Sequence, residues 1–459
     1  MSRNDMHKLS RETPVAALET PHVTTNPLTP SPTTTGAQMY TFLEKLFPIC
    51  RSITGDGVRQ THGLIKAELP NLNIQEIPSG TRCFDWTIPP EWNIRDAYLL
   101  DPAGKKIADF KKTNLHILNY STPINTQLSL EELQDHLYSL PEQPDVIPYS
   151  TSYYDKRWGF CLAHNERKAL KSGTYRAFID SSLEPGHLTY SDLVVPGQTE
   201  QEILISTYTC HPSLANNEAS GPTVATFLAK WLLEGAPHKY TYRFLIGPET
   251  VGPIVYLSKH LVHLQKNVIA GFNLTCVGDN RAYSYLPTRQ GDTLADRIGK
   301  HVLSHIAPDF KRYSFQDRGS DECQYCSPNV NLPVVNLMRS KFLTYPEYHT
   351  SADNLDLVSA EGLLGALHVH QRAIESLENN ATYKATTICE PQLSRHNLRP
   401  SLGATKGLSS YYKNISDILA YSDGRNSLLD IAEIIGCPLW ELYAIATTIE
   451  DRGLLKRID

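Results

Sequence analysis

Histidine and carboxylate side chains recur shortly after apolar runs in the second half of this chain. Each run has the length and β-branched content of a buried strand. Because the carboxyl ends of parallel strands meet along one edge of a sheet, side chains that follow such strands are expected to lie close together. They are His211 and Glu218 after residues 202–208, Glu249 after 241–247, Asp279 after 268–276, and His349 with Asp353 after 332–338.

This mixture of imidazole and carboxylate groups predicts a catalytic zinc site, in which one coordination position stays open for water. Such water loses its proton near neutral pH, and a neighbouring carboxylate can relay that proton. From the residues alone a purely structural interpretation also stays open. In that interpretation His211 is a hydrogen-bonded loop residue, Glu249 a helix cap, Asp279 a turn residue, and Asp353 an N-cap together with Asn354.

The elements that must position these side chains are strands alternating with helices from about residue 202 onward. The helix predicted over 222–233 carries its apolar residues on one face, with Ser220 as its N-cap and Pro222 in its first turn. Alternation of this kind predicts an α/β fold with a mostly parallel central sheet flanked by helices.

Three other segments have a different texture. Residues 1–38 are rich in Thr, Pro and Ser and are predicted to form a disordered tail. Short β-rich runs separated by turn signals predict a small, mainly β domain over 84–179. Helical pieces over 391–459 predict a small winged-helix-like domain, whose balanced charge favours packing or protein contact over DNA binding.

Composition limits the function classes. A chain of 459 residues predicts two or three domains, and its net charge of -6 argues against a nucleic-acid or anionic-membrane partner. There is neither a signal sequence nor an apolar stretch of the roughly 20 residues that a membrane span needs. The 9 scattered cysteines favour reduced thiols in the cytoplasm, and the pair Cys323 and Cys326 is interpreted as packing.

Several longer motifs resemble those of a bacterial aminopeptidase-like family in the clan of zinc aminopeptidases and glutaminyl cyclases. They include CHPSLANNEASGP, GPETVGPIVYLS, GSDECQYCSPNVNLP and YPEYHTSADNLDLVS, and near the N-terminus RSITGDGVRQT. The resemblance covers the chain from Met39 to its end. It implies an aminopeptidase-like α/β domain over 39–83 and 180–390, interrupted by the β-rich domain and followed by the winged-helix-like domain.

The resemblance also implies roles for individual residues. His211, Asp279 and His349 would bind metal, Glu249 would be the general base, and Asp353 would orient its neighbours. Where the clan has a metal-bridging aspartate this chain has Asn217, and where it has a second glutamate this chain has Thr250. Glu218 is therefore the expected substitute ligand, with Asn217 beside the metal, and one zinc ion is expected more than two.

The implied substrate site adds four residues. Asp321 and Glu322 are expected to receive a substrate's ammonium group, or alternatively to pair with Arg51 or Arg339. Arg51 is also expected to line the cleft. Tyr348, like Tyr345, could donate a hydrogen bond to an oxyanion.

The expected function is that of a zinc hydrolase that cleaves an amide next to a free amino group in a peptide or an amino-acid-derived metabolite. One alternative is a single-metal cyclase or acyl transferase in a biosynthetic pathway. Another is a catalytically silent binding or scaffold protein, which the loss of the expected aspartate at Asn217 would favour. A homo-oligomer is compatible with each of these functions.

Overall fold

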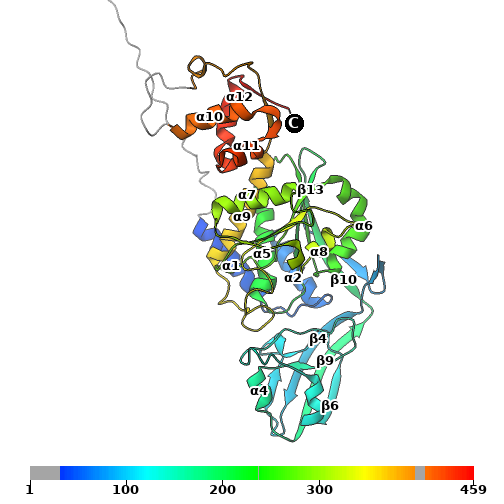
Figure 1. Cartoon of the computed structure of the whole chain (residues 1–459). Helices are drawn as coiled ribbons and strands as arrows, with labels where there is room; N and C mark the ends of the chain where they lie inside the picture. The colour runs from blue at the N-terminus through cyan, green and yellow to red at the C-terminus, as the bar shows by residue number, and fades with distance from the viewer. Residues whose placement is uncertain (1–31, 236, 399–408, 459) are drawn as a thin grey trace, which may run out of the picture.

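The computed structural model describes residues 32–235, 237–398 and 409–458, which form three lobes in a row (Figure 1). Residues 1–31 of the predicted tail lie outside the described part. The remainder of that predicted tail is ordered, because helix α1 begins at Pro32 and continues to Leu46. Proline suits the first turn of a helix, and the apolar side chains from Met39 onward bury against the core. The prediction of disorder was therefore wrong for residues 32–38.

The central lobe is built on an eight-stranded mixed sheet with the order β1-β10-β12-β11-β13-β16-β14-β15. Its middle strands β12, β11, β13 and β16 are parallel, and β10 is antiparallel to β12. This confirms the predicted α/β class and the mostly parallel centre of the sheet. The strands are β1 (Asn73–Pro78), β10 (His187–Val195), β11 (Glu202–Tyr208), β12 (Thr241–Gly247), β13 (Val268–Asn273), β14 (Ser284–Leu286), β15 (Lys311–Arg312) and β16 (Val334–Met338).

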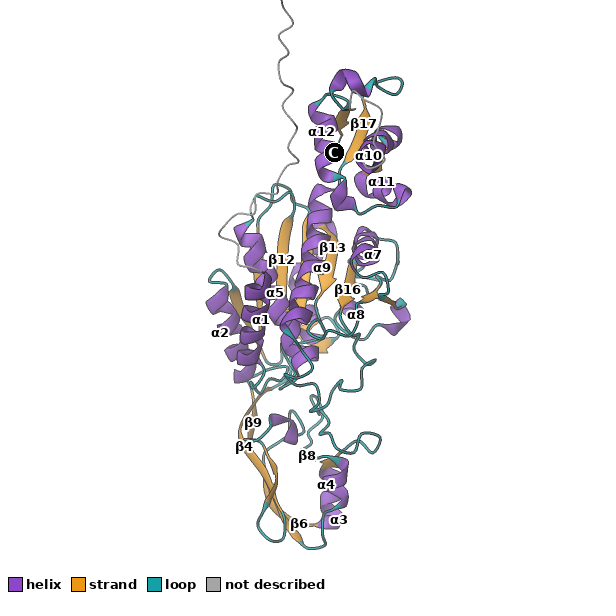
Figure 2. Cartoon of the chain, turned by 90° about the vertical axis from the view of Figure 1, so that its left-hand side faces the viewer, coloured by secondary structure: helices purple, strands orange, loops and turns teal. Residues whose placement is uncertain are grey.

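Helices cover both faces of this sheet, so that alternate strand residues enter two separate cores (Figure 2). The larger core joins one face to α1, α5, α7 and α9, and the smaller core joins the other face to α6 and α8. Parallel strands covered on both faces need apolar side chains in both directions, which explains their nearly continuous apolar runs. The helices are α2 (Asp56–Glu68), α5 (Ser220–Glu234), α6 (Val251–Asn267), α7 (Leu294–Ile306), α8 (Glu322–Tyr325) and α9 (Ala360–Asn379).

The inserted lobe contains a four-stranded antiparallel sheet with its own apolar core. Its two long central strands, β4 and β9, pair along their whole length and connect the lobe to the central one. Because β10 starts at this lobe and runs antiparallel to β12, the parallel strands end at the edge that faces it (Figure 1). The elements are β4 (Glu91–Leu100), β5 (Lys106–Asp109), β6 (Ile124–Ser129), α3 (Leu130–Leu133), β7 (Leu137–Tyr138), β8 (Phe160–Cys161), α4 (His164–Lys168) and β9 (Thr174–Glu184).

The C-terminal lobe packs on the opposite end of the central lobe, against α7 and α9. Arg297 of α7 forms ion pairs with Asp430 and Glu433, and the Leu439 N–H donates to His301 Nε2 over 2.9 Å. Its three-stranded sheet includes β17 and so begins before residue 391, the boundary taken from the sequence. The elements are β17 (Thr382–Ala385), α10 (Ser409–Tyr421), β18 (Asp423–Ser427), α11 (Leu428–Ile435), α12 (Tyr443–Asp451) and β19 (Leu455–Arg457). Among the described residues no helix is long and apolar enough to cross a membrane.

Candidate functional site

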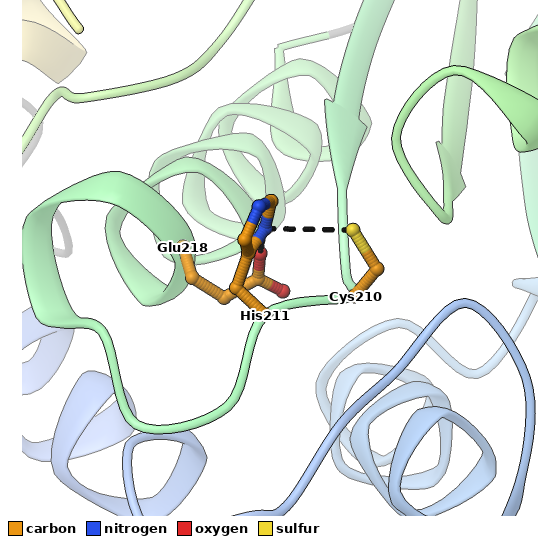
Figure 3. Close-up of side chains that lie close together, drawn as sticks. All are labelled: Cys210, His211 and Glu218. Atoms are coloured by element: carbon orange, nitrogen blue, oxygen red, sulfur yellow. Dashed lines mark hydrogen bonds and ion pairs between the residues drawn. The ribbon is translucent and has the colours of Figure 1, made fainter. Parts of the chain in front are cut away.

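The floor of the candidate site is formed by Cys210, His211 and Glu218, at the carboxyl end of β11 (Figure 3). His211 Nδ1 lies 2.8 Å from Glu218 Oε2 and 3.4 Å from Cys210 Sγ. Since a carboxylate can only accept, Nδ1 carries a proton, and in the neutral imidazole the lone pair is on Nε2, which faces Glu249. Burial lowers the pKa of His211, but its hydrogen bond to Glu218 and the charge of that residue raise the pKa above its ordinary value.

Arg51 lies beneath this floor and pairs with Glu218, 3.3 Å from Nε to Oε1, each side chain being 1% exposed. The guanidinium also donates to the carbonyl oxygens of His211 and Leu46 at 2.9 and 2.7 Å. These contacts bury Arg51 inside the molecule, so the structure gives it a supporting role in place of the expected contact with substrate. The expected pairing of Arg51 with Asp321 or Glu322 is replaced by the pair with Glu218.

Glu249 stands opposite His211 at the end of β12, with 3.7 Å between Glu249 Oε2 and His211 Nε2. Ser320 Oγ donates to the other carboxylate oxygen at 2.7 Å, and the Glu249 N–H donates to Cys210 Sγ at 3.3 Å. Burial raises the pKa of Glu249, and the carboxylates of Glu218 and Glu322 raise it further. The side chain is nevertheless 23% exposed, so solvent reaches this carboxylate.

The turn that carries Glu249 is strained. Thr250 has φ 66 and ψ -61, and the Val251 N–H donates to the Glu249 carbonyl at 2.7 Å, which makes a γ-turn of the rare kind. Asp321 Oδ1 holds this turn by accepting from the Thr250 N–H at 2.7 Å. Non-glycine residues at positive φ are uncommon and concentrate at functional sites. Thr250 was expected as a lost ligand, and in the structure it serves the turn through its backbone.

His349 reaches the same site from the loop after β16 and also has a positive φ, of 56. Its ring stacks on Tyr348 with 3.9 Å between centroids, and lies 5.2 Å from the ring of His211. Burial and the nearby His211 lower the pKa of His349 to about 2, which keeps the imidazole neutral. The structure therefore brings His211, Glu218, Glu249 and His349 together, with Tyr348 beside them.

Asp279 has a different role from the metal ligand expected from the sequence. Both its carboxylate oxygens accept two hydrogen bonds, from the Arg281 N–H and Ser340 Oγ on one side and from Asn216 Nδ2 and the Ser340 N–H on the other. A carboxylate so completely used, in a residue with no exposed surface, has no lone pair directed at the site. We therefore leave Asp279 out of the proposed metal site.

Asp353 caps a helix from a distant part of the chain. Its carboxylate accepts from the N–H groups of Ala215, Asn216 and Asn217 at 2.6 to 3.0 Å, where a short π-helical turn precedes α5. The predicted N-cap, Ser220, instead lies inside the helical segment and donates to the Asn216 carbonyl. That prediction was wrong because the helix is capped by a residue that sequence proximity cannot reveal. The expected role of Asp353 in orienting its neighbours agrees with this geometry.

Asp321 and Glu322 both lie behind Glu249, but in different environments. Glu322 is buried and accepts from the Gly319 and Ser320 N–H groups, which gives it a structural role. Asp321 uses only one oxygen, on Thr250, and its other oxygen has no partner. Burial, together with the charge of Glu249, raises the pKa of Asp321 well above its usual range.

Buried polar atoms without a hydrogen-bond partner are concentrated around this site. Native proteins leave few such atoms unsatisfied, so a group of them in one place indicates that something else binds there. Three of the atoms are acceptors on carboxyl or amide groups, one is an imidazole nitrogen, and one is a guanidinium donor. The five atoms at the site, of eleven in the described part of the chain, are Asn217 Oδ1, Glu218 Oε1, Asp321 Oδ2, His349 Nε2 and Arg51 Nη2.

Four residues of the site were not identified from the sequence. Cys210 had a local signal, because it directly precedes His211 at the end of a predicted strand. Ser320 lies in a motif that was noted for its two acidic neighbours. Tyr149 and Tyr153 come from the inserted lobe and had no signal, since nothing in the sequence shows which loop of that lobe faces the site.

Comparisons with known proteins agree with this architecture. Residues 40–380 match the family described as "Domain of unknown function (DUF4910)", and residues 381–457 match a winged helix-turn-helix family. A Clostridium acetobutylicum protein named "Putative polysaccharide biosynthesis protein with aminopeptidase-like domain" is 43% identical over 425 residues, which are 92% of this chain and 97% of that protein.

Two solved structures show the same fold. The crystal structure of a "putative peptidase" from Clostridium acetobutylicum is 42% identical with a TM-score of 0.87, covering 93% of this chain and 97% of that one. A zinc aminopeptidase from Bacillus subtilis is 14% identical with a TM-score of 0.54, covering 74% and 94%, and thus shares the fold alone. The resemblance and the winged-helix expectation are confirmed at the level of fold. The chain belongs to the DUF4910 family, has an aminopeptidase-like α/β fold, and carries a C-terminal winged-helix domain.

Proposed function

We propose that the protein is a zinc-dependent amide hydrolase of the aminopeptidase type. The observation that carries the proposal is the group of buried nitrogen and oxygen atoms without hydrogen-bond partners that lies near Glu249, a partly exposed glutamate next to the strained Thr250. The aminopeptidase-like fold and the name of the Bacillus subtilis zinc aminopeptidase support the same function.

The residues present fit a zinc ion. His349 is neutral, and its Nε2 has no partner. The His211 Nε2 lone pair faces Glu249 Oε2 across 3.7 Å, an arrangement of two electron-rich atoms that only a shared proton or a cation stabilises. Glu218 adds a carboxylate oxygen, Oε1, which accepts no hydrogen bond and is paired with Arg51 at 3.3 Å. Imidazole nitrogens with carboxylate oxygens form the usual ligand set of hydrolytic zinc. His211, His349 and Glu218 would hold the ion, and zinc would make a bound water acidic and polarise the amide carbonyl.

Glu249 is the residue that would accept the proton of the attacking water. Ser320 fixes one of its oxygens and leaves the other directed into the site. A raised pKa makes the carboxylate a better proton acceptor near neutral pH, and partial exposure gives water access to it. The rigid γ-turn at Thr250 keeps this oxygen in place without help from the substrate.

Asp321 supports a substrate with a free amino group. Its second oxygen is buried, unpartnered and close enough to Glu249 for the two charges to repel. An ammonium group there would relieve that repulsion and provide the missing hydrogen-bond donor. Beside the site, a hollow of about 400 Å³ offers mixed polar and apolar surface to the rest of the substrate; it is bordered by Gln143, Leu343, Thr344, Tyr345, Pro346 and Tyr348.

The experiment is an activity screen of zinc-loaded, full-length protein with amino-acid amides and dipeptides that carry a free or an acetylated amino group. Hydrolysis should require the free amine, and it should stop when a chelator removes the zinc. Glu249→Gln should lower kcat by about 10²–10⁴-fold, the usual worth of a general base. The matched control is Glu375→Gln, on the exposed face of α9, which should leave kcat unchanged.

Three results would overturn the proposal. Activity that persists with Glu249→Gln or without metal would exclude the assigned roles. Products that contain no oxygen from ¹⁸O-labelled water would instead identify the cyclase or acyl-transfer alternative, in which a substrate amine takes the place of water. Absence of both zinc binding and turnover would favour a binding protein.

A further inference from the structure

A segment of the inserted lobe, residues 147–153, pairs with the loop that carries His349. The Tyr149 N–H donates to the His349 carbonyl over 2.8 Å, and the backbones of Ile147 and Ser351 are joined by an N–H···O=C bond of the same length. The Ile147 N–H also donates to Ser351 Oγ at 3.0 Å. The inserted lobe thus forms a short antiparallel bridge with the loop that carries His349, in addition to its connection through β4 and β9.

Tyr149 places its ring against both histidines of the site. The centroid of the ring lies 5.1 Å from that of His211 and 5.1 Å from that of His349, with an edge-to-face geometry in both cases. Its hydroxyl lies 2.7 Å from the hydroxyl of Tyr153, a residue whose φ of 38 is again in the left-handed region. Aromatic rings in edge-to-face contact fix each other's orientation, and each such pair contributes about 0.5–1.5 kcal/mol.

The two tyrosines lie at the open side of the site. Its floor is almost fully buried at Cys210, His211 and Glu218. Solvent instead reaches Glu249 and His349 on the central lobe, and Tyr149 and Tyr153 on the inserted lobe, all of which are partly exposed. The partly exposed side of the site is therefore bordered by residues of both lobes.

We infer that the inserted lobe completes the active site. Tyr149 is a positioning residue that holds the imidazoles of His211 and His349. Tyr149 and Tyr153 together form the wall that faces the substrate. The inference rests on the proposed function for the nature of the substrate. It names a further role, because neither the matching families nor the roles assigned above give the inserted lobe any part in the chemistry.

The physical reason is that the Tyr149 ring contacts both imidazoles. Glu218 holds His211 through Nδ1, and the Tyr208 ring lies 5.3 Å from the His211 ring, so Tyr149 adds a contact on a further side. His349 has strained backbone and an unpartnered Nε2, and its ring is held by Tyr348 on one face and by the edge contact with Tyr149. Residues that orient metal-binding histidines typically change metal affinity by about 10–100-fold when they are removed. Removal of the Tyr149 ring should therefore act on both histidines, although it forms no bond with a ligand atom.

The first test needs neither metal nor substrate. Metal-free full-length protein is treated with diethylpyrocarbonate, which modifies neutral imidazoles, and the rate at each histidine is followed by peptide mass spectrometry. Tyr149→Ala should speed the modification of His211 and His349 at least about fivefold, because the ring that covers them is gone. Tyr149→Phe keeps the ring and should stay within about twofold of the native rate. The control is Tyr98→Ala, which removes an aromatic contact with Phe178 elsewhere in the same lobe.

The second test measures zinc affinity by competition with a chromogenic chelator. We expect Tyr149→Ala to weaken zinc binding about 10-fold or more, with Tyr149→Phe and Tyr98→Ala close to the native protein. Unchanged modification rates in Tyr149→Ala, or an equal increase in Tyr98→Ala, would overturn the inference. If the native protein binds no zinc, the proposed function fails, and the metal-free modification rates still decide the role of Tyr149.

Discussion

The pair formed by Arg51 and Glu218 offers the sharpest test of how the floor of the site is supported. Both side chains are 1% exposed, and Arg51 also serves the buried carbonyls of Leu46 and His211. Removing one member of a buried ion pair costs about 3–5 kcal/mol, because the remaining charge has no solvent. Each carbonyl that loses its donor adds about 1 kcal/mol. Arg51→Met, which keeps the length of the side chain, should therefore lower local stability by at least about 5 kcal/mol.

Hydrogen exchange followed by mass spectrometry on metal-free protein measures this loss at the right place. A change of about 5 kcal/mol corresponds to an increase of roughly 10³–10⁴-fold in the exchange of the slowest amides of β11 and β12. Peptides of the C-terminal lobe serve as an internal control. The milder Arg51→Lys keeps a positive charge near Glu218 and should lower local stability by about half as much as Arg51→Met.

A double-mutant cycle then separates the ion pair from general damage. Arg51→Met combined with Glu218→Leu removes both charges, so its loss should be smaller than the sum of the single losses by about 2–3 kcal/mol. Additive losses in the double variant, or a loss below about 1 kcal/mol in Arg51→Met, would refute the reasoning.

Three further predictions concern neighbouring features. Asn217→Asp adds a carboxylate beside Glu218 and should raise the zinc bound per chain above the native value; an unchanged metal content by plasma mass spectrometry would show that Asn217 does not limit the site. Asp353→Asn weakens the cap on residues 215–217 and should cost about 1–2 kcal/mol, seen as faster hydrogen exchange there and contradicted by native protection. Burial lowers the pKa of His62 to about 3, so folding favours the neutral form. The contribution of His62 to the free energy of unfolding is complete above about pH 6.5, its pKa in the unfolded chain, and is lost as pH falls toward 3. At pH 5 this loss is about 2 kcal/mol. His62→Asn should flatten the pH dependence of urea unfolding in that window, and an equally steep dependence in this variant would speak against the assignment.

The elements of the central sheet were predictable because their signals are local. Residues 202–208 and 241–247 are strands with the predicted ends, since short runs rich in β-forming residues between polar segments have few alternative structures. The order in which the strands end then placed His211 and Glu249 on the same edge of the sheet. Here sequence periodicity and one topological rule were sufficient.

Contacts between distant segments explain the differences. Asp353 caps a helix turn some 136 residues earlier in the chain, so a search for the cap near Ser220 could not find it. Asp279 has the residue type of a ligand, but the side chains and backbone groups that occupy it come from Asn216 and Ser340. Residue type and position identified the candidates, whereas the state of each lone pair depended on partners that only the fold brings close.

The way in which the inserted lobe is attached determines whether it can act as a lid. Besides β4 and β9, it is joined to the central lobe by hydrogen bonds of Asn119 with Ser52 and the Arg51 carbonyl, of Tyr120 with Thr54, and of the 147–149 segment with the loop of His349. At about 1 kcal/mol each, these six bonds amount to about 6 kcal/mol. A free-energy difference of this size leaves on the order of one molecule in 10⁴ with the inserted lobe separated from the central lobe. Substrate exchange at ordinary rates must then proceed with the lobes joined, past the partly exposed side chains of Glu249, His349, Tyr149 and Tyr153, so the inserted lobe acts as a fixed wall and not as a lid.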